Sequence, residues 1–110
     1  MFKLIFLLTK KAGMSDADFF DYYETTHREF ITRLPNVANY LRRYVKPLPG
    51  AAEDRPFDAI TEVWFESDAT YREAMKVAMT PEFQRDVAAD EEHFVDRTRT
   101  KMFTVDERSW

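Results

Sequence analysis

The sequence predicts an α+β fold of the ferredoxin-like kind, in which the elements run β-α-β-β-α-β and helices cover one face of a four-stranded antiparallel sheet. Three observations predict it. Segments rich in strand-forming residues and segments with helical spacing of apolar residues follow one another in that order. Capping residues precede each helical stretch. A chain of 110 residues is the size of one domain, which we expect to span residues 1–110.

The first three elements are expected to be a strand, a helix and a strand. Residues 2–8 are apolar except at Lys3, which is typical of a buried strand. Ser15 is followed three residues later by an acidic residue, as in a capping box, and begins a helix that we expect to reach Leu34, just before a proline. Alternating residues predict a strand over 39–46.

The remaining elements repeat this order with a divided helix. Strand-forming residues fill 57–66, and three of the five prolines lie in the preceding stretch 46–56, which we expect to be a long loop. Ser67 caps a helix expected to end near Ala78, and Thr80 caps another, which starts with a proline and continues to about Glu92. A last strand is expected over 99–105.

Both faces of the predicted sheet carry apolar side chains. In the first strand, Phe2, Leu4, Phe6 and Leu8 share one face and Ile5 and Leu7 share the other; in the third, Ala59, Val63 and Phe65 lie opposite Ile60 and Trp64. Helices cover only one face of such a sheet, and monomers rarely expose a large apolar patch. We therefore expect a homodimer, packed sheet against sheet into a dimeric α+β barrel.

Composition excludes several classes of function. The net charge of −4 argues against a nucleic-acid partner. The absence of cysteine excludes disulfides, iron–sulfur clusters and thiol nucleophiles, and two glycines are too few for a dinucleotide-binding or phosphate-binding loop. No segment approaches the roughly 20 apolar residues of a membrane span. We expect a cytoplasmic protein without a metal, a cofactor or a membrane partner.

His27 is the first candidate for chemistry. Helical spacing places it on one face with Phe19, Tyr23, Phe30 and Leu34, which is the face expected to meet the sheet. It is therefore either a hydrogen-bonded core histidine or a general acid/base in an aromatic pocket, and the spacing leaves both interpretations open.

Carboxylates supply the other candidates. Glu62 lies between apolar neighbours on its strand and is either an ion-pair residue or a pocket residue. Asp90 belongs to an acidic cluster near a helix end, where His93 is expected to be exposed, and Asp96 either orients His27 or caps the backbone. Which of Glu62, Asp90 and Asp96 partners His27 stays open. No ligand spacing indicates a metal site.

The chain resembles the EthD family, named for ethyl tert-butyl ether degradation. The resemblance rests on the order and spacing of several short motifs: Lys3-Leu-Ile-Phe-Leu-Leu8; Met14-Ser15 with Phe19, Tyr22, Tyr23 and His27; Leu34-Pro35 with Tyr40; Phe57-Asp-Ala-Ile-Thr-Glu-Val-Trp-Phe65; Asp90-Glu91 with Phe94 and Asp96; and Phe103-Thr-Val-Asp-Glu107. The residues after the histidine depart from the family pattern, which has small residues or proline where this chain has Arg28 and Glu29.

The resemblance implies the dimeric α+β barrel and a hydrophobic pocket beside the sheet. Relatives with this fold include lactone isomerases, polyketide cyclases, dehydratases and cofactor-free monooxygenases, and many members of the family have no assigned reaction. In the catalytic members a helix histidine aligns with His27. The resemblance therefore favours a pocket role for His27 over a core role.

These observations lead to one hypothesis and three alternatives. We expect a cofactor-independent lyase or isomerase of a small hydrophobic cyclic or aromatic compound. His27 moves a proton, Tyr23 binds the substrate or the histidine, and Asp96 or Glu62 orients the imidazole. Phe6, Trp64 and Phe94 form the walls. The alternatives are a non-catalytic binding protein of a degradation pathway, an oxidoreductase of the cofactor-free monooxygenase type, and a haem protein with His27 as axial ligand.

Overall fold

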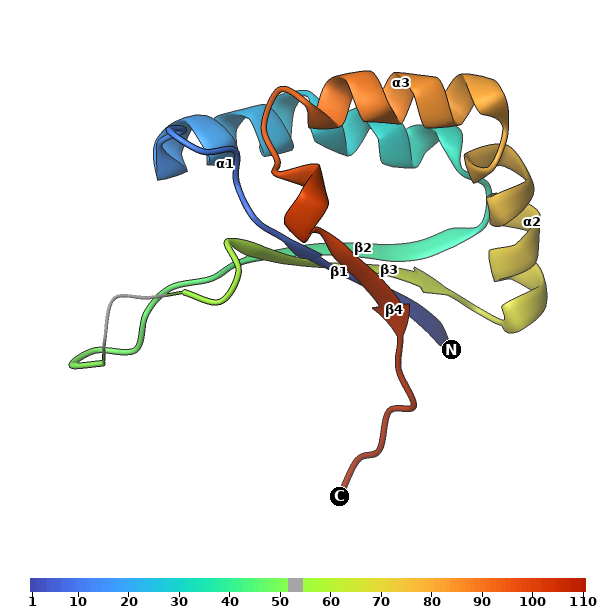
Figure 1. Cartoon of the computed structure of the whole chain (residues 1–110). Coiled ribbons are helices and arrows are strands. Elements are labelled where there is room, and N and C mark those ends of the chain that lie inside the picture. The colour runs from blue at the N-terminus through green and yellow to red at the C-terminus, as the bar shows by residue number, and fades with distance from the viewer. Residues whose placement is uncertain (52–54) are drawn as a thin grey trace.

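The computed structural model describes residues 1–51 and 55–110 as a four-stranded antiparallel sheet with all helices on one side (Figure 1). The order of the strands is β2-β3-β1-β4, so the two central strands are β1 and β3. The predicted ferredoxin-like α+β fold is confirmed. The loop expected over 46–56 includes residues 52–54, which lie outside the described residues; its other residues form no helix or strand.

The strands are β1 (Phe2–Leu8), β2 (Val37–Tyr44), β3 (Ala59–Phe65) and β4 (Lys101–Thr104). β1 has the predicted bounds. β2 starts two residues earlier than expected, and its register shifts between Val37 and Asn39. β4 is shorter than expected because Arg97–Arg99 form a 3₁₀ turn, η2, before it. In that turn the Asp96 carboxylate accepts a hydrogen bond from the Thr98 backbone N–H at 3.0 Å.

The helices are α1 (Asp16–Thr25), η1 (His27–Arg33), α2 (Asp68–Ala78) and α3 (Pro81–Glu91). Their N-termini follow the predicted caps, because the side chains of Ser15, Ser67 and Thr80 accept hydrogen bonds from the backbone N–H groups of Asp18, Thr70 and Phe83. Among the described residues, no helix is both long and apolar enough to cross a bilayer.

The expectation of one helix from Ser15 to Leu34 is wrong. The α-helix ends at Thr25, and the chain continues as the 3₁₀ helix η1, so His27 lies at the start of η1 and not in mid-helix. Two adjacent β-branched residues, Thr25 and Thr26, disfavour α-helix here, and the Thr25 hydroxyl donates a hydrogen bond to the Asp21 carbonyl oxygen at 2.7 Å.

The core lies between the sheet and the helices in two adjoining clusters. One joins Leu8 and Ala59 of the sheet to Phe19, Tyr23 and the fully buried Phe94. The other joins Leu4, Val63 and Phe65 to Ala74 of α2. Residues of both clusters line a cavity that contains the candidate site.

The outer face of the sheet, which the helices leave uncovered, carries the alternate residues of each strand: Lys3, Ile5, Leu7, Leu41, Arg43, Ile60, Glu62, Trp64, Lys101 and Phe103. Glu62 accepts a hydrogen bond from Trp64 Nε1 at 2.8 Å and forms an ion pair with Arg43. Lys3 Nζ lies 3.9 Å from the centre of the Trp64 ring. The prediction of apolar side chains on both faces is confirmed.

Candidate functional site

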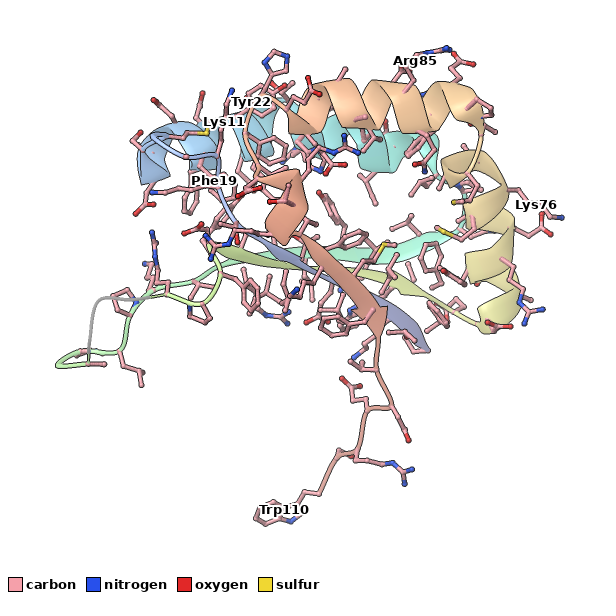
Figure 2. All side chains as sticks on the ribbon, in the orientation of Figure 1. Lys11, Phe19, Tyr22, Lys76, Arg85 and Trp110 are labelled. Atoms are coloured by element: carbon pink, nitrogen blue, oxygen red, sulfur yellow. The ribbon has the colours of Figure 1, made fainter. Side chains whose placement is uncertain are left out.

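A cavity of about 450 Å³ lies between the inner face of the sheet and the helices (Figure 2). It is lined mainly by apolar and aromatic side chains, with a few polar groups. The lining residues are Leu4, Phe6, Leu8, Tyr23, His27, Phe30, Ile31, Leu34, Tyr40, Thr61, Val63, Phe65, Met75, Ala78, Met79, Phe83, Gln84, Val87, Glu91, Phe94, Val95, Arg97, Thr100 and Met102.

His27 and Asp90 form a pair in the wall of this cavity. His27 Nδ1 lies 2.5 Å from Asp90 Oδ2, and the Tyr22 hydroxyl donates a hydrogen bond to Asp90 Oδ1 at 2.8 Å. The Asp90 side chain is 7% exposed and the His27 side chain is 18% exposed. Asp90 is in the last turn of α3, so the fold joins residues that are 63 positions apart in the chain.

This contact fixes how His27 can act. A carboxylate at Nδ1 accepts the proton of that nitrogen and selects the tautomer whose Nε2 carries a lone pair. Aromatic rings hold the imidazole in place, with the ring centres of Phe94 and Tyr23 at 4.7 and 5.1 Å. Nε2 is therefore the nitrogen left to exchange a proton with a ligand in the cavity.

Three hydroxyl groups form a second polar feature of the cavity. The Tyr23 hydroxyl is hydrogen-bonded to the Thr61 hydroxyl, and Tyr40 lines the cavity beside them. Burial raises the pKa of Tyr23 well above its usual value and also raises the pKa of Tyr40. Burial, together with the Asp90 carboxylate, raises the pKa of Tyr22 to about 12. These phenols therefore act as neutral hydrogen-bonding groups near neutral pH.

Glu91 and Arg97 also line the cavity, and neither is among the site residues predicted from the sequence. Burial raises the pKa of Glu91, against the opposing electrostatic effects of Arg97 and His27. The sequence did hold a signal for Glu91, because Phe83, Val87 and Glu91 are four residues apart along α3 and share its inward face.

Five of the candidate residues lie where the hypothesis needs them or close by. The cavity is lined by His27, Tyr23, Phe6 and Phe94. The sequence left open which of three carboxylates partners His27, and in the structure it is Asp90. His93 is exposed, as expected. Phe30 and Leu34, expected on the same inward face as His27, line the cavity too.

Three expected placements are wrong. Trp64 and Glu62 do not line the cavity, because they belong to the outer face of the sheet, where they contact each other. Asp96 does not contact His27, because its Oδ1 caps η2 and accepts hydrogen bonds from the Thr98 backbone N–H and hydroxyl, the latter at 2.6 Å. Within residues 1–51 and 55–110, no group of three histidine or acidic side chains is arranged to hold a metal ion.

Solved structures with the same fold span nearly the whole chain. An EthD family protein from Bacillus halodurans is 16% identical, with a TM-score of 0.67 over 98% of this chain and 100% of its own. SnoaB from Streptomyces nogalater, described as a cofactor-independent oxygenase, is 13% identical, with a TM-score of 0.60 over 99% and 94%. A dimeric ferredoxin-like protein from Thermobifida fusca is 15% identical, with a TM-score of 0.60 over 94% and 88%. No curated protein sequence matches the chain.

The model of the EthD domain matches residues 11–98. The match includes η1 with His27, α3 with Asp90, and every helical residue that lines the cavity. This chain belongs to the EthD family.

Proposed function

We propose that this EthD-family chain is a homodimeric, cofactor-independent enzyme that moves protons on a small hydrophobic cyclic or aromatic compound, as a lyase or isomerase. One observation carries the proposal: the His27–Asp90 pair opens on an aromatic cavity. A histidine kept only for packing needs neither a buried carboxylate nor an adjoining cavity. A general base needs both, to fix its tautomer and to reach a substrate.

The dimensions and lining of the cavity support the substrate class. Cavities of 300–1,000 Å³ hold compounds of drug size, and about 450 Å³ suits a compound of two or three fused rings. Phe6 and Phe30 offer apolar ring faces to such a compound. The hydroxyls of Tyr23 and Tyr40 offer hydrogen bonds to its oxygen atoms, which fixes its orientation relative to His27.

The uncovered outer face of the sheet supports a second copy of the chain as partner. Leu7, Ile60 and Phe103 leave apolar area partly or fully exposed there, and soluble monomers rarely leave such a face open. The similar Thermobifida fusca protein is dimeric. The cavity lies on the opposite side of the sheet, so dimerisation through the outer face leaves its walls in place.

A cofactor-free oxygenase is the second candidate, favoured by the fold likeness to SnoaB. His27 could serve as the base in this reaction too. Removal of a proton from a phenol or ketone yields an electron-rich anion, and oxygenation without a cofactor starts from such an anion. The two candidates differ in the co-substrate: an oxygenase consumes O₂ with turnover, whereas a lyase or isomerase reacts equally under nitrogen.

Methionine methyl groups give a direct test of the binding site. Met75, Met79 and Met102 line the cavity, whereas Met1 and Met14 do not. In protein labelled with ¹³C at the methionine methyls, we expect 2-naphthol to shift the first three NMR signals and leave the other two unchanged. Uniform shifts, or shifts confined to Met1 and Met14, would contradict a ligand site in the cavity.

Turnover then separates an enzyme from a binding protein. With a compound that the cavity binds, His27→Gln is expected to lower the rate by about 10² to 10⁴ while the fold and binding persist. His93→Gln is the matched control, because His93 is exposed and outside the cavity. Binding without any turnover by the wild type would make the chain a non-catalytic ligand-binding protein.

A further inference from the structure

The last turn of α3 presents two carboxyl groups in different directions. Asp90 points to His27 and Tyr22 and is fully engaged by them. Glu91, the next residue, lines the cavity and is partly buried. Within the described residues its carboxyl group forms no hydrogen bond and no ion pair within 4.0 Å. A carboxyl group without a partner in a mainly apolar cavity is costly for stability and is typical of a functional group.

The titratable and charged groups around Glu91 come from three elements. They are His27 of η1, Asp90 of α3 itself and Arg97 of η2. Burial has a larger effect on the pKa of Glu91 than any of these charges and raises it. The protonated form therefore persists to a higher pH than in a solvated glutamate, which suits a group that gives up a proton.

We propose that Glu91 is the proton donor of this site and acts together with His27 on a cyclic ketone that can form an enol. The inference rests on the proposed function, because it assumes that the substrate occupies the cavity next to His27. Glu91 is then a second catalytic residue, and the substrate is an enolisable cyclic ketone.

The proposed step is a balanced transfer of two protons. His27 Nε2 takes a proton from the carbon next to the carbonyl group, and the electron pair of that C–H bond becomes the C=C bond of the enol. The π electron pair of the carbonyl group moves to its oxygen, which takes the proton of the Glu91 carboxyl group. The products are an enol, a His27 imidazolium and a Glu91 carboxylate, and the reverse step restores all three groups.

Two features of the cavity stabilise the products of this step. Asp90 holds the opposite side of the imidazolium at 2.5 Å. Arg97, which lines the same cavity, favours the negative charge that Glu91 acquires. The imidazolium thus forms in contact with a carboxylate, and the Glu91 carboxylate forms in the electric field of a guanidinium, which is the preorganisation that lowers a barrier.

Deuterium exchange provides the test and needs no natural substrate. The probe is 2-tetralone, a bicyclic enolisable ketone, and NMR measures the loss of its α-protons in D₂O. We expect the wild type to accelerate the exchange over buffer, and Glu91→Gln to lower that acceleration about 10- to 100-fold. Glu92→Gln is the matched control, because Glu92 is the exposed neighbour outside the cavity, and it should behave as wild type.

The pH profile separates a proton donor from a structural residue. In the wild type, the rate should fall on the alkaline side as Glu91 loses its proton, and Glu91→Gln should abolish that fall. A Glu91→Gln rate equal to wild type, or an unchanged alkaline limb, overturns the proposal.

A wild type that does not accelerate exchange also overturns the role of Glu91, whether or not 2-tetralone binds. The naphthol shifts at Met75, Met79 and Met102 are measured without any exchange. They decide separately whether the cavity is a ligand site.

Discussion

Thr61 and Glu62 are neighbours in β3, yet they lie in opposite environments. On the inner face, the Thr61 hydroxyl pairs with Tyr23 in the floor of a cavity that still has room for a ligand. On the outer face, the Glu62 carboxylate is engaged by Arg43 and Trp64. The polar groups of the inner face lie beside the cavity, whereas those of the outer face are engaged by neighbouring side chains on the same face.

This difference separates two tasks of one sheet. A surface whose polar groups satisfy one another can be covered by a partner without leaving a buried group unpaired. A cavity whose wall contains an unpartnered carboxyl group and an available imidazole nitrogen is instead ready for a small molecule. We therefore propose that assembly uses the outer face and chemistry the inner one, and the following experiments test that division.

The largest effect is expected from a charge on the outer face. Leu7→Asp places a carboxylate opposite Ile60 on that face, where dimerisation would bury it. Because burying an unpaired charge is costly, we expect the dimer dissociation constant to rise at least about 100-fold, measured by analytical ultracentrifugation. Trp64→Asp, on the same face, should act in the same direction.

Ala17→Asp is the matched control for charge. Ala17 is exposed in the first turn of α1, where a carboxylate is well tolerated, so the dimer should persist. A wild type that is monomeric at micromolar concentration would remove the assembly role of the outer face. An unchanged dimer in both outer-face variants would place the interface elsewhere.

The next effect concerns the inner face. Asp90→Asn keeps the shape of the side chain but removes the charge that selects the tautomer of His27. We expect the 2-tetralone exchange rate to fall about 10- to 100-fold, the usual cost of losing the group that orients a catalytic histidine. Binding of 2-naphthol, followed by the methionine methyl shifts, should change little.

Asp86→Asn is the control in the same helix. Asp86 pairs with Arg33 on the surface, at 3.1 Å, and does not line the cavity. Exchange by this variant should match wild type. An Asp90→Asn rate as high as wild type would show that His27 needs no orienting carboxylate.

The sequence was sufficient for the fold because the relevant signals are local. A run of apolar residues predicted β1 to the residue, and the caps Ser15, Ser67 and Thr80 marked three helix starts correctly. The end of α1 was missed, because the helical period continues through residues 26–34 while the backbone tightens to a 3₁₀ helix. A tighter helix still turned His27, Phe30 and Leu34 toward the cavity.

The site was harder to predict because it depends on contacts between distant residues. Periodicity shows that Trp64 and Val63 face opposite ways, but not which of them faces the helices. The choice of Asp90 over Asp96 as partner of His27 depends on how the end of α3 packs against η1, a contact across 63 residues. Asp96 instead accepts a hydrogen bond from Thr98, two residues away. This local contact costs less chain entropy than a contact with the distant His27.

The smallest expected effect is a gain in stability from Glu91→Gln. The folded chain raises the pKa of Glu91, so the unfolded chain loses that proton first as the pH rises. Wild-type stability therefore falls as the pH rises from the ordinary glutamate value to the raised one, and stays lower above it. Glutamine carries no charge and escapes this loss, so at pH 7 the free energy of unfolding of the variant should be higher than that of wild type. The two proteins should converge in stability near pH 4, where both side chains are neutral.

Urea unfolding at the two pH values measures this difference in stability, with Glu92→Gln as the exposed control. A residue that weakens the fold while raising the exchange rate is retained for chemistry. Equal stability of the variant and wild type at both pH values would instead mean that the Glu91 carboxylate is well solvated, which would weaken the case for a donor on the inner face.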